Sequence, residues 1–419
     1  MSVSLHRLPN GVRVVTEDMP GLHSASIGVW VTAGGRHERA RENGIAHFLE
    51  HMACKGTERR SAIDIAEEIE NVGGYINAYT SRDMTAYYAR VLENDVDLAL
   101  DVISDIVLNP AFDPKEIEVE RHVILQEIGQ ALDTPDDIIF DWLQEAAFPD
   151  QPMGRTILGP AERIEAFGRD DLAGFVANHY QPGSIIVAAA GAIDPDAVLK
   201  KVEATFGALP GGTLAAPEPA AFRGGERRVV KDLEQAHVAF GFEMPGYRDD
   251  AIYAAQIFTT AFGGGMSSRL FQEVREKRGL CYTIFAQAGA YADTGLLTIY
   301  AGTSGEEVGE LTSLTCDELA RAADGLRGDE IDRARAQIKA GLLMGLESPS
   351  NRAERLARMV AIWDRVPDVT ETIERIDAVT GKDVRNLAGR MVESKAALAL
   401  YGQVSGAPEL QALQRRLVA

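Results

Sequence analysis

Residues 211–225 read GGTLAAPEPAAFRGG, and this stretch decides how the rest of the sequence is divided. It is rich in glycine, alanine and proline and has few large apolar side chains, so it cannot pack a core and is typical of a linker. We therefore expect a domain over residues 1–212, a linker over 213–225 and a second domain over 226–419. A chain of 419 residues is long enough for each domain to bury a core of its own.

The two halves show the same order of signals, as a duplicated fold would. The apolar stretches SIGVWV at 26–31 and AHVAFGF at 236–242 both predict a buried strand. Three anchors match at offsets of 212 to 214 residues: Gly28 with Gly241, Tyr88 with Tyr300, and Glu116 with Glu330. Such close offsets indicate two homologous repeats.

Helical patterns separate the predicted strands. Residues 96–108, 115–132 and 330–346 carry apolar side chains at three- and four-residue spacing, which is typical of amphipathic helices. Strands and helices come in unequal runs along each half. This order predicts an α+β fold of two repeats, each a mainly antiparallel sheet packed with helices.

Charge and composition exclude several classes of protein. The chain has 63 acidic and 42 basic side chains, a net charge of −21, which argues against a nucleic-acid partner. Three scattered cysteines do not form a disulfide framework and fit a reducing compartment. No leader pattern and no run of about 18 apolar residues is found, so we expect a cytoplasmic protein without membrane attachment.

The stretch GIAHFLEHMACKG at residues 44–56 holds a metal-binding pattern. On a helix, His47, Glu50 and His51 project from one side, because residues three and four apart are neighbours there. Two imidazoles one turn apart can bind one zinc ion, while the carboxylate between them reaches a water molecule on the metal. The spacing is the mirror image of the H-E-x-x-H motif.

Catalytic zinc commonly takes a third protein ligand, and the helix expected over 115–132 offers one. Glu127 and Glu120 are seven residues apart and so lie on nearly the same face of that helix. His122 points about 140° away from Glu127, which favours a structural or solvent-facing role for it.

These motifs resemble those of the inverzincin zinc metallopeptidases of the pitrilysin and insulinase type, and among them the mitochondrial processing peptidase β-subunit and its bacterial relatives. The resemblance rests on HFLEH with a glutamate 76 positions after His51, on NVGGYINAYTSRDMTAYYA (71–89), on ERHVILQEI (120–128) and on GGGMSSRLFQEVREKRGLCY (263–282).

The resemblance implies a role for each of these residues. It makes His47, His51 and Glu127 the ligands of one Zn²⁺ per chain and Glu50 the general base. It also makes Glu120 an outer carboxylate that orients a ligand.

The second half has no metal site in this interpretation. The repeat offsets carry the ligand positions to threonine, alanine, glycine and lysine, none of which forms an equivalent centre. The resemblance instead assigns Arg275 and Tyr282 to the substrate backbone and to polarisation of the scissile carbonyl. A phenol or a guanidinium suits a developing oxyanion.

The strand that contains Asn77, Ala78 and Tyr79 is also expected to bind substrate. In the resembled family the corresponding strand is an exposed sheet edge, onto which a peptide adds as a further strand. The alternative is a buried core strand with Asn77 in a turn.

Together with these motifs, the resemblance implies a zinc endopeptidase that acts on peptides or unfolded segments in a closed chamber, and that forms a homodimer. One alternative is a non-catalytic peptide-binding or scaffold relative of the processing peptidases, although such relatives have lost metal ligands. Another is a metal-dependent hydrolase of a different substrate, because H-x-x-E-H determines the chemistry of water and not the bond that is cut. Peptide hydrolysis rests on the resemblance alone.

Overall fold

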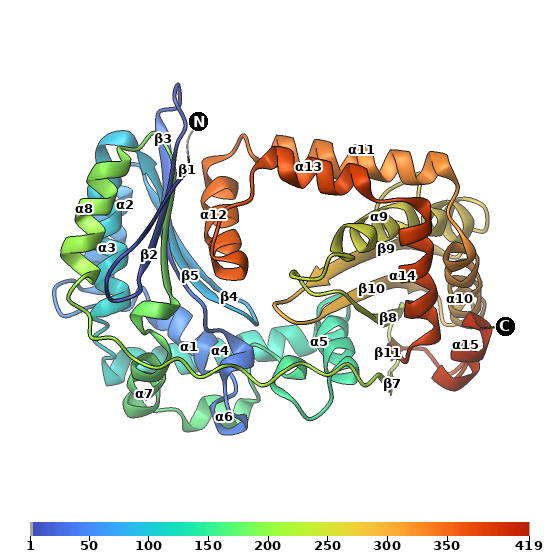
Figure 1. Ribbon diagram of the computed structural model, residues 1–419. Helices are drawn as coiled ribbons and strands as arrows, with labels where there is room; N and C mark the ends of the chain where they lie inside the picture. The colour runs from blue at the N-terminus through green and yellow to red at the C-terminus, as the bar shows by residue number, and fades with distance from the viewer. Residues whose placement is uncertain (1–2, 419) are drawn as a thin grey trace. The chain divides into compact units, whose positions relative to one another are not determined.

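The computed structural model describes residues 3–418, which form two compact units (Figure 1). Unit 1 contains residues 3–128, Thr156–Glu218 and Leu343–Pro367. Unit 2 contains Gly129–Arg155, Pro219–Leu342 and residues 368–418. Neither unit is a single continuous piece of the chain.

Unit 1 is built on a six-stranded sheet with the order β1-β2-β6-β3-β5-β4. Its strands are β1 (Val3–Arg7), β2 (Arg13–Asp18), β3 (Ser24–Val31), β4 (Tyr75–Thr80), β5 (Thr85–Leu92) and β6 (Ile185–Gly191). All neighbours pair antiparallel except β2 with β6. The strand β4 therefore ends the sheet on one side.

Helices cover both faces of this sheet (Figure 1). One face packs against α2 (Ala62–Glu70), α3 (Val96–Leu108) and α8 (Pro195–Phe206), and the other against α12 (Pro349–Trp363). Three further helices pack together beside the sheet: α1 (Ile45–Met52), α6 (Ala161–Ala166) and α7 (Arg169–His179).

Unit 2 repeats the plan with five strands in the order β7-β11-β8-β10-β9. They are β7 (Gly225–Val230), β8 (Ala236–Met244), β9 (Cys281–Ala290), β10 (Gly295–Thr303) and β11 (Ala396–Gly402), and only β7 and β11 run parallel. One face packs against α9 (Ile252–Gly263), α10 (Val308–Asp324), α14 (Gly381–Glu393) and α15 (Leu410–Leu417), and the other against α5 (Pro135–Ala147). The remaining helices are α13 (Val369–Ala378), and α4 (Pro114–Leu132) and α11 (Gly328–Gly345), which include residues of both units. The predicted α+β fold of two repeats, each a mainly antiparallel sheet packed with helices, is confirmed.

The glycines at the ends of two matching strands align the repeats. Gly191 ends β6, and a Cβ there would lie 2.8 Å from Cα of Ala25; Gly402 ends β11 in the same way, 3.4 Å from Cα of Ala236. Both glycines have a positive φ, which other residues rarely adopt. Ala25 of β3 therefore corresponds to Ala236 of β8, which is an offset of 211 residues.

This alignment corrects one of the sequence anchors. Gly28 pairs with Tyr88 in the sheet of unit 1, and Ala239 pairs with Tyr300 in the sheet of unit 2. Gly28 thus corresponds to Ala239, and its match to Gly241 is wrong by two residues, whereas Tyr88 and Tyr300 do correspond. A shift of two residues keeps every side chain on the same face of a strand, so an apolar pattern cannot detect it.

The two halves of the chain also exchange a helix. The helix α5 precedes the expected linker but belongs to unit 2, and α12 follows it but belongs to unit 1. Residues 210–224 form neither helix nor strand, as the linker composition suggests. Composition marks where the backbone is irregular, but it does not determine which sheet an amphipathic helix covers.

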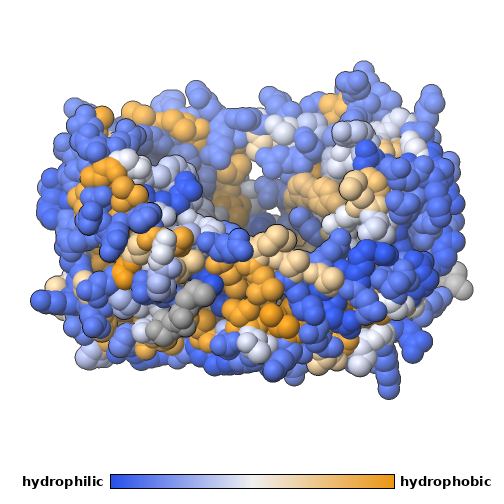
Figure 2. All heavy atoms as spheres, turned by 90° about the horizontal axis from the view of Figure 1, so that it is seen from above, coloured by the Kyte–Doolittle hydropathy of each residue, from blue (hydrophilic) through white to orange (hydrophobic). Residues whose placement is uncertain are grey.

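The face of the molecule drawn in Figure 2 is largely polar. In the view of Figure 2, hydrophilic residues cover most of the face that is drawn, in keeping with a chain in which 25% of residues are charged. Within residues 3–418 no helix combines the length and the apolar character that a membrane span needs.

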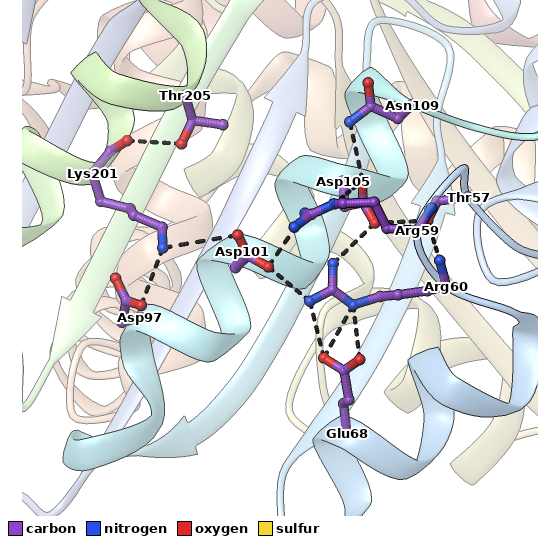
Figure 3. Close-up of polar contacts among 10 residues, drawn as sticks. All are labelled: Thr57, Arg59, Arg60, Glu68, Asp97, Asp101, Asp105, Asn109, Lys201 and Thr205. Atoms are coloured by element: carbon purple, nitrogen blue, oxygen red, sulfur yellow. Dashed lines mark hydrogen bonds and ion pairs between the residues drawn. The ribbon is translucent and has the colours of Figure 1, made fainter.

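A buried carboxylate ties the loop after α1 to α3 (Figure 3). The side chain of Asp105 is fully buried and accepts hydrogen bonds from Thr57 (2.6 Å), Arg59 (3.1 Å) and Arg60 (2.9 Å). Arg60 also binds Glu68 on α2. Burial alone would raise the pKa of Asp105, but these donors outweigh it and hold that pKa below the usual aspartate value.

We expect Asp105→Asn to lower the free energy of unfolding by about 3 kcal/mol at neutral pH, because it replaces a fully buried carboxylate that accepts charge-assisted hydrogen bonds from Arg59 and Arg60 by a neutral amide. A depressed pKa contributes stability above the ordinary aspartate value of about 4, and this is lost as the pH falls below it. The difference between variant and wild type should therefore shrink in acid. Urea unfolding at several pH values measures it, with exposed Asp97→Asn on the same helix as control. Equal losses from both variants would contradict the prediction.

Candidate metal centre

Two groups fix the start of α1. Gly44 precedes the helix with φ of 97°, and a Cβ there would lie 2.8 Å from the carbonyl oxygen of Leu158, so only glycine fits. The buried carboxylate of Glu38 accepts hydrogen bonds from the backbone N–H of Gly44 (3.0 Å) and Ala46 (2.9 Å). It satisfies N–H groups that have no partner within the helix and complements the helix dipole.

The apolar side of α1 determines where its polar side points. Ile45, Phe48 and Leu49 are buried in a cluster with Ile124 of α4 and Phe175 of α7. A helix that buries this stripe presents His47, Glu50 and His51 on another side. The local sequence therefore sets the orientation of the motif.

The structure brings His47, His51 and Glu127 together. One nitrogen or oxygen atom of each lies within 4.8 Å of the others, and this is the only such group among residues 3–418. Oε2 of Glu127 is 3.5 Å from Nε2 of His47 and 3.3 Å from Nε2 of His51. Ligands about 2.1 Å from a tetrahedral ion are roughly 3.4 Å apart, so these donors fit zinc in spacing and in chemistry.

Glu120 lies behind His51 and not among the converging donors. Its Oε2 is 2.8 Å from Nδ1 of His51, and its Oε1 is 2.6 Å from Nζ of Lys55. A carboxylate that accepts the Nδ1 proton leaves the Nε2 lone pair free for a metal. Glu127 therefore has the position of a ligand, and Glu120 that of an outer partner.

His122 is exposed and does not join the group. Its Nδ1 lies 2.7 Å from the carbonyl oxygen of Glu118 on its own helix.

His47 is electrically neutral at pH 7. Burial and the neighbouring His51 lower its pKa to about 4. A neutral imidazole keeps the lone pair that a metal ligand needs.

Glu50 is near enough to His51 and Glu127 for their charges to influence its pKa, but it is not one of the three converging donors. Burial raises the pKa of its carboxyl group above the usual glutamate value, and the neighbouring Thr80 and His51 partly oppose that rise. A raised pKa suits a carboxylate that accepts and returns a proton near neutral pH.

The strand with Asn77, Ala78 and Tyr79 is β4, the edge strand of its sheet. The N–H of Ser81 binds the carbonyl of Met84 across the turn to β5. Because N–H groups alternate in direction along a strand, those of Ala78 and Thr80 point to the free edge.

The free edge faces the candidate metal centre. The hydroxyl of Thr80 donates to the carbonyl of Ala46 on α1 at 3.3 Å, and Thr80 lies close enough to Glu50 to lower the pKa of its carboxyl group. The N–H of Ala78 binds Oδ1 of Asn77, the side chain of its neighbour, at 2.9 Å. Asn77 thus lies within the strand and not in a turn, and the edge runs beside the candidate base.

Tyr79 links this strand to α12. Its hydroxyl donates to both carboxylate oxygens of Glu354 at 2.7 and 2.8 Å, and Nε1 of Trp30 donates to the same carboxylate at 3.0 Å. Sequence reasoning missed Glu354, which follows Tyr79 by 275 residues and carries no local signal. It also missed Lys55, although this residue stands four positions after His51 in the metal motif.

Arg275 and Tyr282 lie together in unit 2. Arg275 is in the π-helical segment Phe271–Glu276, and its guanidinium lies 5.0 Å from the ring centroid of Tyr282, the second residue of β9. The side chain of Tyr282 is 80% exposed, so its hydroxyl is accessible.

Comparisons with known proteins agree with this fold. Residues 13–161 match the family described as Insulinase (Peptidase family M16), and residues 166–338 match the Peptidase M16 inactive domain. The chain is 39% identical over 400 residues to an uncharacterized zinc protease of Rickettsia bellii, covering 95% of this chain and 97% of the relative. It is 36% identical over 401 residues to the uncharacterized zinc protease YmxG of Bacillus subtilis, covering 95% and 98%.

A protease from Helicobacter pylori has the same fold, with a TM-score of 0.87 over 96% of this chain and 99% of that one at 22% identity. The chain belongs to the insulinase family, peptidase family M16. The resemblance to pitrilysin- and insulinase-type zinc metallopeptidases is thereby confirmed.

We expect Glu127→Gln to weaken zinc binding by more than the roughly 10- to 100-fold that loss of an outer partner causes, because it removes an anionic ligand. Glu120→Gln should fall within that smaller range. Competition with a chelator measures both, and Glu116→Gln on the same helix is the control. Wild-type zinc affinity in Glu127→Gln would mean that the third ligand lies elsewhere.

Proposed function

We propose that this chain is a zinc-dependent endopeptidase that holds one Zn²⁺ and hydrolyses peptides or unfolded segments. The observation that carries the proposal is the convergence of His47, His51 and Glu127 beside Glu50, a carboxylate with a raised pKa that is not itself among the donors. The family and the names of the relatives support zinc and proteolysis.

The roles of the side chains follow from their positions. Zinc bound by His47, His51 and Glu127 supplies a Lewis acid that lowers the pKa of a water molecule. Glu50 accepts a proton from water through a carboxylate oxygen as the water oxygen attacks the peptide carbonyl carbon. When the C–N bond breaks, Glu50 returns that proton to the leaving nitrogen.

The edge of β4 supports a way to hold a peptide regardless of its sequence. A substrate that adds as a further strand takes hydrogen bonds from main-chain groups, and the N–H of Ala78 points to that edge. The side chain of Asn77, which now binds this N–H, would be displaced. Because Thr80 on the same edge lies close to Glu50, the added strand would run past the base.

Arg275 and Tyr282 are proposed to bind the substrate backbone and to polarise the scissile carbonyl oxygen. An exposed phenol beside a guanidinium is suited to stabilise a developing negative charge. The description of residues 166–338 as an inactive domain supports the absence of a metal centre from the second half.

We also propose an oligomeric state and a cellular compartment for this chain. We place two copies of the chain in a homodimer whose units close the reaction chamber, in line with the resemblance to processing peptidases. The described cysteines Cys54, Cys281 and Cys316 are all free thiols, which supports the cytoplasm as the compartment.

The rival interpretation is a non-catalytic scaffold relative. Such a protein needs neither a complete set of zinc ligands nor a base beside them. The chain has all four groups in one place, and this favours catalysis.

We expect Glu50→Gln to bind zinc as wild type does and to lose nearly all peptide hydrolysis, because an amide keeps the shape of the side chain but cannot accept the proton. Metal analysis and cleavage of a fluorogenic peptide measure the two properties, with exposed Glu67→Gln as control. Loss of zinc from Glu50→Gln would show that this residue is a ligand. Full activity would remove it from the mechanism.

We expect Ala78→Pro to raise KM for long peptides about five- to tenfold, the effect of one lost hydrogen bond, with zinc content and melting temperature nearly unchanged. Proline is tolerated at a sheet edge and lacks only the N–H that points outward. The control Ala78→Ser keeps that N–H and should keep the wild-type KM. An unchanged KM or severe unfolding of the proline variant would contradict the edge-binding model.

A further inference from the structure

Lys55 extends the hydrogen-bonded chain behind the metal ligands by one residue. It lies three residues after the end of α1, and its Nζ lies 2.6 Å from Oε1 of Glu120, whose other oxygen lies 2.8 Å from Nδ1 of His51. Only 30% of its side chain is exposed. The ammonium group therefore faces into the protein and toward the centre.

Glu120 depends on this partner. The residue is 4% exposed, and within residues 3–418 its carboxylate binds His51 through one oxygen and Lys55 through the other. A buried carboxylate with one donor on each oxygen is held in a single orientation by two charge-assisted contacts. Without Lys55, Oε1 would be buried with no partner, which is costly and allows the group to rotate.

The loop that carries Lys55 is itself held in place. The backbone N–H of Lys55 binds the carbonyl of Met52 at 3.1 Å, and two residues further on Thr57 begins the network around Asp105 (Figure 3). The lysine therefore extends from a segment anchored at both sides. Because the segment is fixed, the ammonium group of Lys55 can hold the Glu120 carboxylate in one orientation.

We infer that Lys55 is a positioning residue of the zinc centre, which acts through Glu120 to hold the His51 ring with its Nε2 toward Glu127. It touches neither substrate nor metal in this role. The inference rests on the zinc centre of the proposed function and adds the residue that orients one ligand.

A different role for Lys55 predicts the opposite result. A cation that acted on zinc only through its charge would repel the metal, so its removal would strengthen zinc binding. A cation that positions Glu120 supports zinc binding, so its removal would weaken it. The sign of the change in zinc affinity separates the two roles.

The experiment measures zinc affinity of the full chain by chelator competition. We expect Lys55→Met to weaken zinc binding roughly tenfold, as loss of an outer partner does, and Lys55→Arg to stay near wild type because it keeps a donor cation. The exposed lysine variant Lys200→Met is the matched control and should bind zinc as wild type does. Unchanged or tighter zinc binding by Lys55→Met would overturn the inference.

A double-mutant cycle shows whether the effect passes through Glu120. In the Glu120→Gln background, replacing Lys55 should cause no further loss of zinc affinity, whereas additive losses would overturn the inference. Thermal melting of the metal-free variants checks folding, and Lys55→Gln takes the place of Lys55→Met in the cycle if the methionine variant is unfolded. Absence of zinc binding in the wild-type chain would refute the proposed function. If the wild-type chain binds zinc and the Lys55 variant binds it equally well, only this inference is refuted.

Discussion

The packing of α1 into the apolar cluster it shares with α4 and α7 is the contact on which the candidate site depends. Burial of Ile45, Phe48 and Leu49 turns the two imidazoles and Glu50 away from the core, and Ile124 on α4 joins the same cluster. The next turn of α4 then carries Glu127 to the imidazole nitrogens. Hydrophobic burial is not directional by itself, so the periodicity of the helix converts it into a ligand geometry.

Buried carboxylates hold this arrangement in register. Glu38 caps α1 at its start, Asp105 anchors the loop after it, and Glu120 contacts Nδ1 of His51. Each is paired with N–H or cationic donors, because an unpaired buried charge would be strongly destabilising. A chain with a net charge of −21 thus uses some of its acidic side chains as buried hydrogen-bond acceptors that hold the segments around the candidate metal centre in place.

Each half of the chain gives one helix to the compact unit of the other half, so the two units do not coincide with the two halves. The face of the first sheet opposite α3 is covered by α12 from the second half, and α12 supplies the Glu354 carboxylate that binds Tyr79 on the edge strand. The repeat with the candidate metal centre is therefore complete only when α12 from the other half of the chain covers its sheet. This gives the repeat without ligands a structural role in addition to any role in binding substrate.

The sequence by itself determined the features that local periodicity controls. The spacing of His47, Glu50 and His51 placed all three on one side of a helix, and the order of strands and helices predicted an α+β fold of two repeats. Local spacing could not distinguish Glu120 from Glu127, because both lie on nearly the same face of α4. It also could not reveal Lys55 and Glu354 as partners, the two-residue shift between β3 and β8, or the exchange of α5 and α12. These features depend on which helix and sheet faces pack against each other across tens to hundreds of residues of sequence. Several apolar helix faces could cover the same sheet face, so only the tertiary structure decides which of them does.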